Sequence, residues 1–316
     1  MTVAVIGTGV EASHPDLRGR VVRSKDVNAT HDEGSAPVQG THAAGVIAGT
    51  GRNYGGDGLV GLAPEARILP FRVYRDNTAL TAATARAIMD AARQGAGVID
   101  VTVGFRRPSD DLRTAVKFAA DRDALVVAGA GDTGGKGNAV TYPAAYPEVL
   151  SVTAVDKKGT VWPDSHRGKD VDLAAPGVDI LTTARSHDYW TGTGTGFAAA
   201  WVAGSAALLR SDHPKWTVEQ VTRSLTETAT ERGKADWNAR YGWGTVAPAA
   251  ALSRRAAPSG SDAAAPANAQ AAGIGVRHAS DTGPILVVLA VAATTLVLAV
   301  AAWFLIRRSV TASDDE

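Results

Sequence analysis

The chain contains 316 residues, of which 45% are hydrophobic and none is cysteine. This composition excludes an intrinsically disordered chain, a disulfide scaffold and a thiolate metal site. Lysine and arginine number 32 against 32 aspartate and glutamate, so the chain lacks the net positive charge that is typical of nucleic-acid-binding proteins.

Short apolar runs alternate with longer helical stretches over most of the chain. The apolar runs span residues 3–6, 68–73, 98–103, 125–130 and 150–154, and the helical stretches span residues 82–92, 110–120, 198–210 and 218–229. Strands that alternate with helices predict a three-layer α/β fold, in which a doubly wound, mostly parallel sheet is covered on both faces. Ligand sites in such folds lie where strands end and helices begin, so residues at those junctions are the candidates for chemistry.

The first predicted strand is followed by a Gly-x-Gly-x-x-Ala sequence at residues 7–12, and Asp26 lies 19 residues after Gly7. This order is typical of a dinucleotide-binding turn. Such a turn requires a helix that starts at its second glycine, and the Ser-His-Pro-Asp sequence at residues 13–16 and Gly19 would interrupt that helix. The sequence therefore predicts no dinucleotide cofactor.

The C-terminal part of the chain has the composition of a tether followed by a membrane span. Residues 253–283 are rich in Ala, Pro, Ser and Gly, as flexible linkers are. Every position from Ile285 to Ile306 is uncharged, and this stretch is long enough for a helix across a hydrocarbon core of about 30 Å. The predicted order is thus a large domain at residues 1–252, the linker, a transmembrane helix at residues 284–306 and a short tail at residues 307–316.

The distribution of arginines predicts the orientation of this span. Arg307 and Arg308 follow it, whereas Arg277 is the single arginine or lysine shortly before it. By the positive-inside rule the tail lies in the cytoplasm and the large domain outside it, so the predicted localisation is the cell membrane, with a single pass. The chain starts directly with a predicted strand and shows no export segment, so we expect one upstream of Met1.

Three segments stand out in this order: Val-Ala-Val-Ile-Gly-Thr-Gly-Val at residues 3–10, Gln-Gly-Thr-His-Ala-Ala-Gly at residues 39–45, and Gly-Thr-Gly-Phe-Ala-Ala-Ala at residues 194–200. They resemble the signature blocks of the subtilisin-like serine proteases (subtilases), which contain the catalytic aspartate, histidine and serine. Further matches lie at residues 14–17, 98–104, 126–132, 142–144, 172–177 and 241–244. The resemblance covers residues 2–252 and implies the subtilisin-like fold.

The chain departs from the family pattern within these blocks. The positions that match the catalytic aspartate, histidine and serine hold Gly7, Gln39 and Gly196, and the position that matches the oxyanion-binding asparagine holds Asp132. Triad catalysis needs a nucleophilic hydroxyl, an imidazole base and a carboxylate that orients the base, and none of them is present there. An ionised Asp132 would accept hydrogen bonds instead of donating one to a developing oxyanion. Because losing the triad costs about 10⁶ in turnover in a member of this family, the sequence predicts a catalytically inactive pseudoprotease.

The resemblance also implies a peptide groove between two segments. The matching residues are Thr102, Val103 and Gly104 after one predicted strand, and Gly129, Ala130 and Gly131 at the end of the next. Their backbone would pair with an extended peptide by strand addition, which needs no triad. The alternative is that they are packed strand ends without a ligand. The predicted partner is therefore an extended peptide or a protein.

Neighbouring residues offer alternatives for the lost groups. His42 lies three residues after Gln39, on the same side of a predicted helix, and matches a structural histidine of the family. Thr193 and Thr195 lie close to Gly196, but each would need a base in reach to act as a nucleophile. Their other role is to shape the turn and the start of the following helix.

Calcium, which many subtilases bind, has candidate ligands but no evident site. Acidic residues are available at Asp26, Asp32, Glu33, Asp110 and Asp111, yet they form no recognisable ligand loop. The sequence therefore predicts no metal or other cofactor, and leaves calcium open.

An outward-facing domain, a tether and a single C-terminal span together resemble one branch of the family, the mycosins of actinobacterial type VII secretion systems. That resemblance implies type VII secretion components as partners. Mycosins usually carry a signal peptide, an N-terminal extension and disulfide cysteines, which this chain does not show. The favoured interpretation is a membrane-anchored, mycosin-like pseudoprotease with a structural or peptide-binding role. Two alternatives remain, namely an active serine-type endopeptidase that uses other residues and the product of a truncated or decaying protease gene.

Overall fold

A computed structural model describes residues 1–22, 38–75, 78–233 and 236–254. These residues contain a six-stranded parallel sheet with the strand order β2-β1-β5-β6-β7-β8. Its strands are β1 (Thr2–Gly7), β2 (Arg67–Arg72), β5 (Val98–Val101), β6 (Leu125–Gly129), β7 (Val149–Val155) and β8 (Leu173–Pro176). The predicted α/β fold with a mostly parallel sheet is confirmed.

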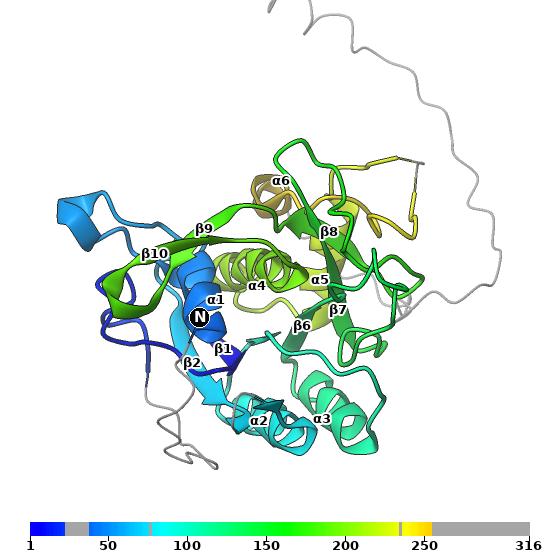
Figure 1. The fold of residues 1–316 in the computed structure, drawn as a ribbon, viewed down its shortest axis with the longest axis horizontal. Coiled ribbons are helices and arrows are strands. Elements are labelled where there is room, and N and C mark those ends of the chain that lie inside the picture. The colour runs from blue at the N-terminus through cyan, green and yellow to red at the C-terminus, as the bar shows by residue number, and fades with distance from the viewer. Residues whose placement is uncertain (23–37, 76–77, 234–235, 255–316) are drawn as a thin grey trace, which may run out of the picture. The chain divides into compact units, whose positions relative to one another are not determined.

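Helices cover both faces of this sheet (Figure 1). The helices α2 (Thr81–Arg93) and α3 (Asp110–Ala120) pack on one face, and α1 (Gln39–Ala48) and α4 (Thr195–Asp212) pack on the other. Two shorter helices, α5 (Val218–Glu227) and α6 (Pro248–Ser253), contact α4. The strands β5 and β7 are buried along their whole length because each face of the sheet meets a layer of helices.

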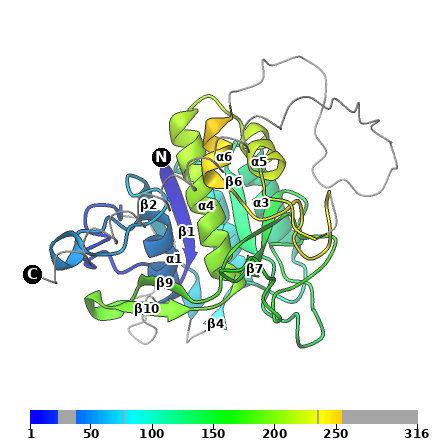
Figure 2. The same cartoon turned by 90° about the horizontal axis from the view of Figure 1, so that it is seen from above.

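Two hairpins and two short 3₁₀ helices complete the described elements: β3 (Tyr74–Arg75) with β4 (Thr78–Ala79), β9 (Ile180–Thr183) with β10 (Tyr189–Gly192), η1 (Asn53–Gly56) and η2 (Arg185–His187). The β9-β10 hairpin lies beside α1 (Figure 2). The hydroxyls of Thr182 and Thr183 donate hydrogen bonds to the carbonyls of His42 and Thr41, at 2.6 and 2.8 Å. These bonds attach the hairpin to α1, the helix that contains residues 39–45.

Element boundaries differ from the predicted ones mainly at α4. This helix begins at Thr195, three residues before the predicted start at residue 198, so Gly196 belongs to its first turn. Residues 12–20 form turns, so no helix starts at Gly9. The strand β8 and the β9-β10 hairpin were not among the predicted elements, because their runs are short and two of the three are partly exposed.

Some predicted features lie outside the described residues. They are the linker beyond Arg254, the span at residues 284–306, the tail at residues 307–316, and the acidic residues Asp26, Asp32 and Glu33. Within the described ranges, no helix is long and apolar enough to cross a membrane. Nor do these ranges contain a group of three or more His, Cys, Asp or Glu residues placed to hold a metal ion.

Candidate functional site

A cavity of about 800 Å³ opens where the central strands end and where α1 and α4 begin. Gln39, Asp132 and Gly196, which lie far apart in the sequence, all line it. The groove residues Thr102, Val103, Gly104, Gly129 and Gly131 line it as well. Ala130 does not, because it is fully buried and its N–H donates to the carbonyl of Val152. Gly7 ends β1 and is also buried, behind Thr102.

Thr102 occupies the space beside Gly7 in which a side chain would lie. Its Oγ1 is 2.1 Å from the position that a Cβ on Gly7 would take, and this hydroxyl donates to the carbonyl of Ile6 at 3.1 Å. A carboxylate at position 7 would therefore collide with Thr102 in its present rotamer. The end of β1 is packed as a glycine site.

Gln39 is the first residue of α1 and makes a polar contact that needs no imidazole. Its Oε1 accepts a hydrogen bond from the Tyr74 hydroxyl at 3.0 Å. Burial raises the pKa of Tyr74, so this phenol keeps its proton at neutral pH and acts as the donor. The amide of Gln39 cannot take up a proton near neutral pH.

Gly196 leaves the start of α4 open to the cavity. No atom lies within 4 Å of the position that a Cβ on Gly196 would take. A Cβ would fit there without collision. The absence of a nucleophile at position 196 is therefore a property of the sequence and not a result of crowding.

Asp132 binds to the amino end of α4. Its Oδ1 accepts hydrogen bonds from the backbone N–H of Thr195 at 2.9 Å and from the Thr195 hydroxyl at 2.7 Å. The N-cap residue of α4, Gly194, has no side chain, so this carboxylate supplies the cap from another segment of the chain. The carboxylate thus uses a helix N–H that would otherwise be free to bind a negatively charged group.

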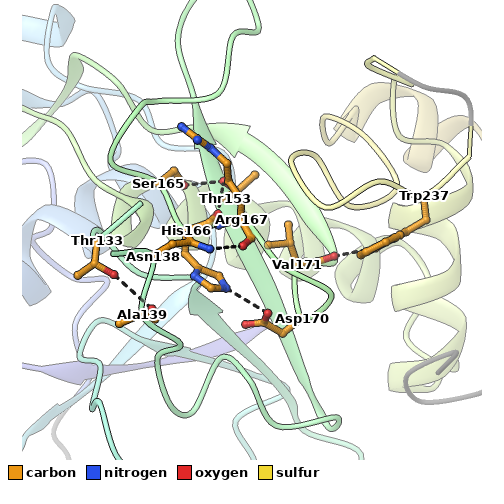
Figure 3. A network of polar contacts seen from close by, with 10 residues as sticks. All are labelled: Thr133, Asn138, Ala139, Thr153, Ser165, His166, Arg167, Asp170, Val171 and Trp237. Carbon is orange, nitrogen blue, oxygen red and sulfur yellow. Dashed lines mark hydrogen bonds and ion pairs between the residues drawn. The ribbon is translucent and has the colours of Figure 1, made fainter. Parts of the chain in front are cut away.

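A polar network joins the segment that follows Asp132 to residues 166–170 (Figure 3). The backbone N–H of His166 donates to the carbonyl of Gly131 at 2.8 Å, and the His166 imidazole Nε2 lies 3.1 Å from Asp170 Oδ1. Asn138 and Arg167 exchange two further hydrogen bonds between the loops. Burial would raise the pKa of Asp170, but the hydrogen bond and the charge of His166 hold it below its ordinary value. These contacts restrict where the Asp132 backbone can lie.

An aromatic stack forms another wall of the cavity. The His42 imidazole lies parallel to the Trp190 indole, with ring centroids 4.7 Å apart and an interplanar angle of 12°. The Phe197 ring stacks at 6.0 Å from His42 and lies 6.0 Å from Trp190. Burial lowers the pKa of His42 to about 4, so its imidazole is uncharged at neutral pH and is a weak base.

The threonine hydroxyls near Gly196 have partners other than a base. The Thr195 hydroxyl donates to Asp132 and accepts from the N–H of Gly131 at 3.1 Å, and the Thr193 hydroxyl accepts from the N–H of Asp179 at 3.0 Å. Among the described residues, no hydrogen bond joins either hydroxyl to an imidazole nitrogen. Within the described ranges, neither hydroxyl is therefore paired with an imidazole base.

The two walls of the groove differ in their free backbone groups. In the described part of the chain, the backbone N–H and C=O groups of Val103 and Gly104 form no hydrogen bond. On the other wall, the N–H and C=O of Gly131 are both paired, with Thr195 and His166. The segment at residues 103–104 is therefore the wall that can add a strand.

Thr141 requires glycine at two positions of these walls. Its side chain lies 2.3 Å from the position of a Cβ on Gly104 and 2.3 Å from that of a Cβ on Gly131. Gly131 also has a φ of +116°, which other residues rarely adopt. The threonine fills the space between the walls at this point.

Sequence reasoning did not single out Tyr74, Thr141, Asp188 or Trp190 as site residues, although all but Tyr74 line the cavity. A signal was present for Trp190, because the Tyr-Trp-Thr run at residues 189–191 has the composition of a short strand. Thr141 directly precedes the matched segment at residues 142–144. No local pattern indicates that Tyr74 contacts Gln39, because the two lie 35 residues apart.

Known proteins resemble this chain over most of its length. Residues 1–244 match the Subtilase family. The chain is 37% identical over 236 residues to the "Thermophilic serine proteinase" of Bacillus sp. (strain AK1), which covers 72% of this chain and 58% of that protein. It is 35% identical over 248 residues to Subtilisin E of Bacillus subtilis (strain 168), which covers 77% of this chain and 63% of that protein. The chain thus spans about three-fifths of the length of both relatives.

Solved structures agree with this assignment. The crystal structure of fervidolysin from Fervidobacterium pennivorans, described as a keratinolytic enzyme related to subtilisin, superposes with a TM-score of 0.72 and 30% identity, covering 81% of this chain and 42% of that one. The prenylagaramide maturation protease PagA superposes with a TM-score of 0.70 and 27% identity, covering 80% of this chain and 92% of that one. With the family match over most of the sequence and the same fold in these proteases, the chain belongs to the Subtilase family of subtilisin-like serine proteases.

Proposed function

We propose that this subtilase homologue does not hydrolyse peptide bonds and instead holds an extended peptide or a protein partner in its cavity. The observation that carries the proposal is the open space over Gly196, where no atom lies within 4 Å of a would-be Cβ. In a subtilase this is the place of the nucleophile. Without it no acyl-enzyme can form.

The surroundings of Gly196 support the loss of chemistry. Thr102 fills the space beside Gly7, and Gln39 accepts a hydrogen bond from Tyr74. Asp132 places a carboxylate at the start of α4, which would disfavour a developing oxyanion. Restoring one residue alone would therefore not restore catalysis.

The cavity itself supports peptide binding. Its volume of about 800 Å³ is within the usual range of ligand pockets. The unpaired backbone groups of Val103 and Gly104 are suited to an extended chain, because strand addition uses backbone hydrogen bonds that any peptide supplies.

We further propose that the protein is a mycosin-like subtilase that acts at the cell membrane, within or beside a type VII secretion complex. This part of the proposal is supported by the sequence, which has an Ala- and Pro-rich tether and an uncharged stretch from Ile285 to Ile306 followed by Arg307 and Arg308. In this arrangement the subtilase domain is extracytoplasmic and the C-terminus is cytoplasmic.

The loss of chemistry is tested by active-site labelling and peptide hydrolysis. The natural chain is compared with a restored variant that carries Gly7→Asp, Gln39→His, Gly196→Ser and Asp132→Asn, together with Thr102→Ala to free the space beside residue 7. We expect that a fluorescent phosphonate labels only the restored variant, and that only this variant cleaves a casein substrate. A second restored variant that keeps Gly196 is the matched control and should stay unlabelled.

Labelling of the natural chain at a residue that can be mapped would contradict the proposal, because that residue would be a relocated nucleophile. Circular dichroism of all three proteins shows whether each one is folded. A natural chain that is folded but is neither labelled nor cleaves the substrate is then inactive.

Membrane orientation is tested with single cysteines, since the chain has none of its own. Asp57→Cys places one thiol on an exposed loop of the domain, and Ser313→Cys places one in the tail. In cells that export the protein, a membrane-impermeant maleimide should label the first variant and leave the second unlabelled until the cells are broken. Equal labelling of both thiols in intact cells would rule out this topology.

A further inference from the structure

The open space over Gly196 is bordered by a carboxylate and by aromatic rings. The Asp132 carboxylate is hydrogen-bonded to Thr195, the first residue of α4, and Phe197 is the third residue of that helix. Both residues line the cavity with Gly196. Trp190 stacks on His42, and its ring lies next to that of Phe197. A group that enters this cavity therefore finds both a carboxylate and aromatic rings among its lining residues.

The Asp132 carboxylate retains an acceptor for such a group. Oδ1 is used by the N–H and hydroxyl of Thr195. Oδ2 lies 3.0 Å from the position that a Cβ on Gly194 would take, and it forms no hydrogen bond within the described residues. The residue as a whole is exposed, so a ligand can reach it.

Trp190 presents a large apolar surface to the same cavity. The residue is 48% exposed, and the His42 ring lies nearly parallel to the indole, with the ring centroids 4.7 Å apart. An indole that is partly exposed and lines a cavity can bind an ammonium or guanidinium group, since aromatic faces attract cations. The carboxylate adds a charge-assisted hydrogen bond for the same group.

We propose that the cavity binds the cationic group of a peptide, with Asp132 as its anionic partner and the Trp190 and Phe197 rings as its aromatic wall. This inference rests on the proposed peptide-binding function and specifies the ligand class. The group is an ammonium or guanidinium from a lysine or arginine side chain, or a free N-terminal ammonium. It occupies the position at which an active subtilase would stabilise negative charge.

Three other charged residues line the cavity. Arg106 and Arg185 line it together with Asp188, and all three are exposed residues of connecting segments. Asp132, in contrast, is bonded to the first turn of α4, of which Gly196 is part. Among the charged residues that line the cavity, Asp132 is thus the one bonded to the helix that carries Gly196, while an acidic ligand would favour Arg106 and Arg185.

The proposal is tested by titrating the full chain with peptides of the form Ac-Ala-Ala-X-Ala-Ala-NH₂. X is lysine, arginine, norleucine, glutamate or alanine, and an uncapped Ala₅ amide, compared with the acetylated alanine peptide, tests the free N-terminus. Binding is followed by calorimetry and by the indole N–H resonance of Trp190, which is assigned with Trp190→Phe. We expect the lysine or arginine peptide to bind roughly tenfold more tightly than the norleucine peptide, or the uncapped peptide to bind that much more tightly than its acetylated form.

Two variants show which residues produce the preference. Asp132→Asn keeps the shape and the hydrogen bond acceptor for Thr195 but removes the charge, so the preference should disappear while the norleucine peptide still binds. Trp190→Leu should weaken the binding of the cationic peptides severalfold more than the binding of the norleucine peptide. Asp57→Asn removes a charge from an exposed loop outside the cavity and should leave the preference unchanged.

The outcomes separate this inference from the proposed function. Equal binding of all peptides, tighter binding of the glutamate peptide, or a cationic preference that survives Asp132→Asn would overturn the cation site and leave peptide binding in place. If none of the peptides binds to the folded chain, the peptide-binding function and the cation site both fail.

Discussion

At the scale of single residues, Gly7 and Thr102 depend on each other. The Thr102 hydroxyl lies 2.1 Å from where a Cβ on Gly7 would be and donates to the carbonyl of Ile6. A larger residue at position 7 can be accommodated only if the threonine changes its rotamer and gives up that hydrogen bond. The absence of a side chain at Gly7 is thus matched by the position of the Thr102 hydroxyl.

Gly7→Ala should therefore lower the free energy of unfolding by about 1–3 kcal/mol, the usual cost of overpacking. In a chain that also carries Thr102→Ala, Gly7→Ala should lower the free energy of unfolding clearly less, because the colliding hydroxyl is gone. Chemical denaturation of the two single variants and the double variant gives the coupling energy. Gly196→Ala is the matched control and should be neutral or stabilising by up to about 1 kcal/mol, since its Cβ meets no atom within 4 Å. An equal cost of Gly7→Ala in both backgrounds would show that Thr102 is not the cause.

At the scale of elements, α4 and α5 obtain their N-terminal caps in different ways. In α5, Thr217 and Gln220 form a capping box within one turn of chain. In α4, the cap residue is Gly194, and the carboxylate comes from Asp132, 63 residues away. The start of α4 therefore depends on the loop that follows β6, which the His166 network holds in place.

Removal of this distant cap should destabilise the protein measurably. We expect Asp132→Ala to lower the free energy of unfolding by about 1 kcal/mol, because the N–H and hydroxyl of Thr195 lose their acceptor. Asp132→Asn should cost less, since an amide oxygen can still accept. Thermal unfolding compares both with Asp57→Asn, which removes the same charge from a loop. If Asp132→Ala were as stable as the natural chain, the carboxylate would not be a cap.

At the scale of the whole molecule, one buried acid lies within the central sheet. The strand register places Asp100 of β5 between Val5 and Val127, whose side chains belong to the core between the sheet and the α1 and α4 helices. Asp100 is fully buried, and neither carboxyl oxygen has a hydrogen-bond partner among the described residues. Burial raises its pKa to about 8, so the folded protein holds Asp100 as the neutral acid at neutral pH.

This buried acid predicts that stability falls as the pH rises. In the unfolded chain Asp100 ionises near pH 4, whereas the folded state keeps the proton up to about pH 8. Between these values each pH unit should therefore cost roughly 1 kcal/mol of stability, and the penalty should level off above the folded pKa. Asp100→Asn removes this proton linkage. In urea unfolding, the free energy of unfolding of the variant should therefore rise relative to that of the natural chain between pH 5 and pH 8.

Burial also raises the pKa of Asp172, to about 7, so this residue contributes to the same fall of stability with pH. The Asp100→Asn variant therefore keeps a smaller slope of stability against pH. Asp156, an exposed acid with a lowered pKa, provides the control Asp156→Asn, which should leave the slope over this range unchanged. An unaltered slope in Asp100→Asn would mean that Asp100 is already ionised in the folded protein.

Much of the fold was accessible from the sequence because it depends on local patterns. The apolar runs predicted the five strands β1, β2, β5, β6 and β7, and the alternation with helices predicted a parallel sheet. The helix α3 was predicted to the residue, and the structure shows that Ser109 caps its first turn, which is acidic. The short strand β8 and the β9-β10 hairpin were missed, because runs of four residues carry too little periodicity to be recognised.

The sequence by itself determined the family, the parallel α/β architecture and the residue types at positions 7, 39, 132 and 196, because ordered motifs and hydrophobic periodicity are local properties of the chain. Only the tertiary structure decided what surrounds those positions. Thr102 against Gly7, Tyr74 on Gln39, Asp132 on Thr195 and Trp190 on His42 are contacts between segments 35 to 148 residues apart. Such contacts arise when strands and helices pack, and no local pattern encodes which side chain from a distant segment fills a given space.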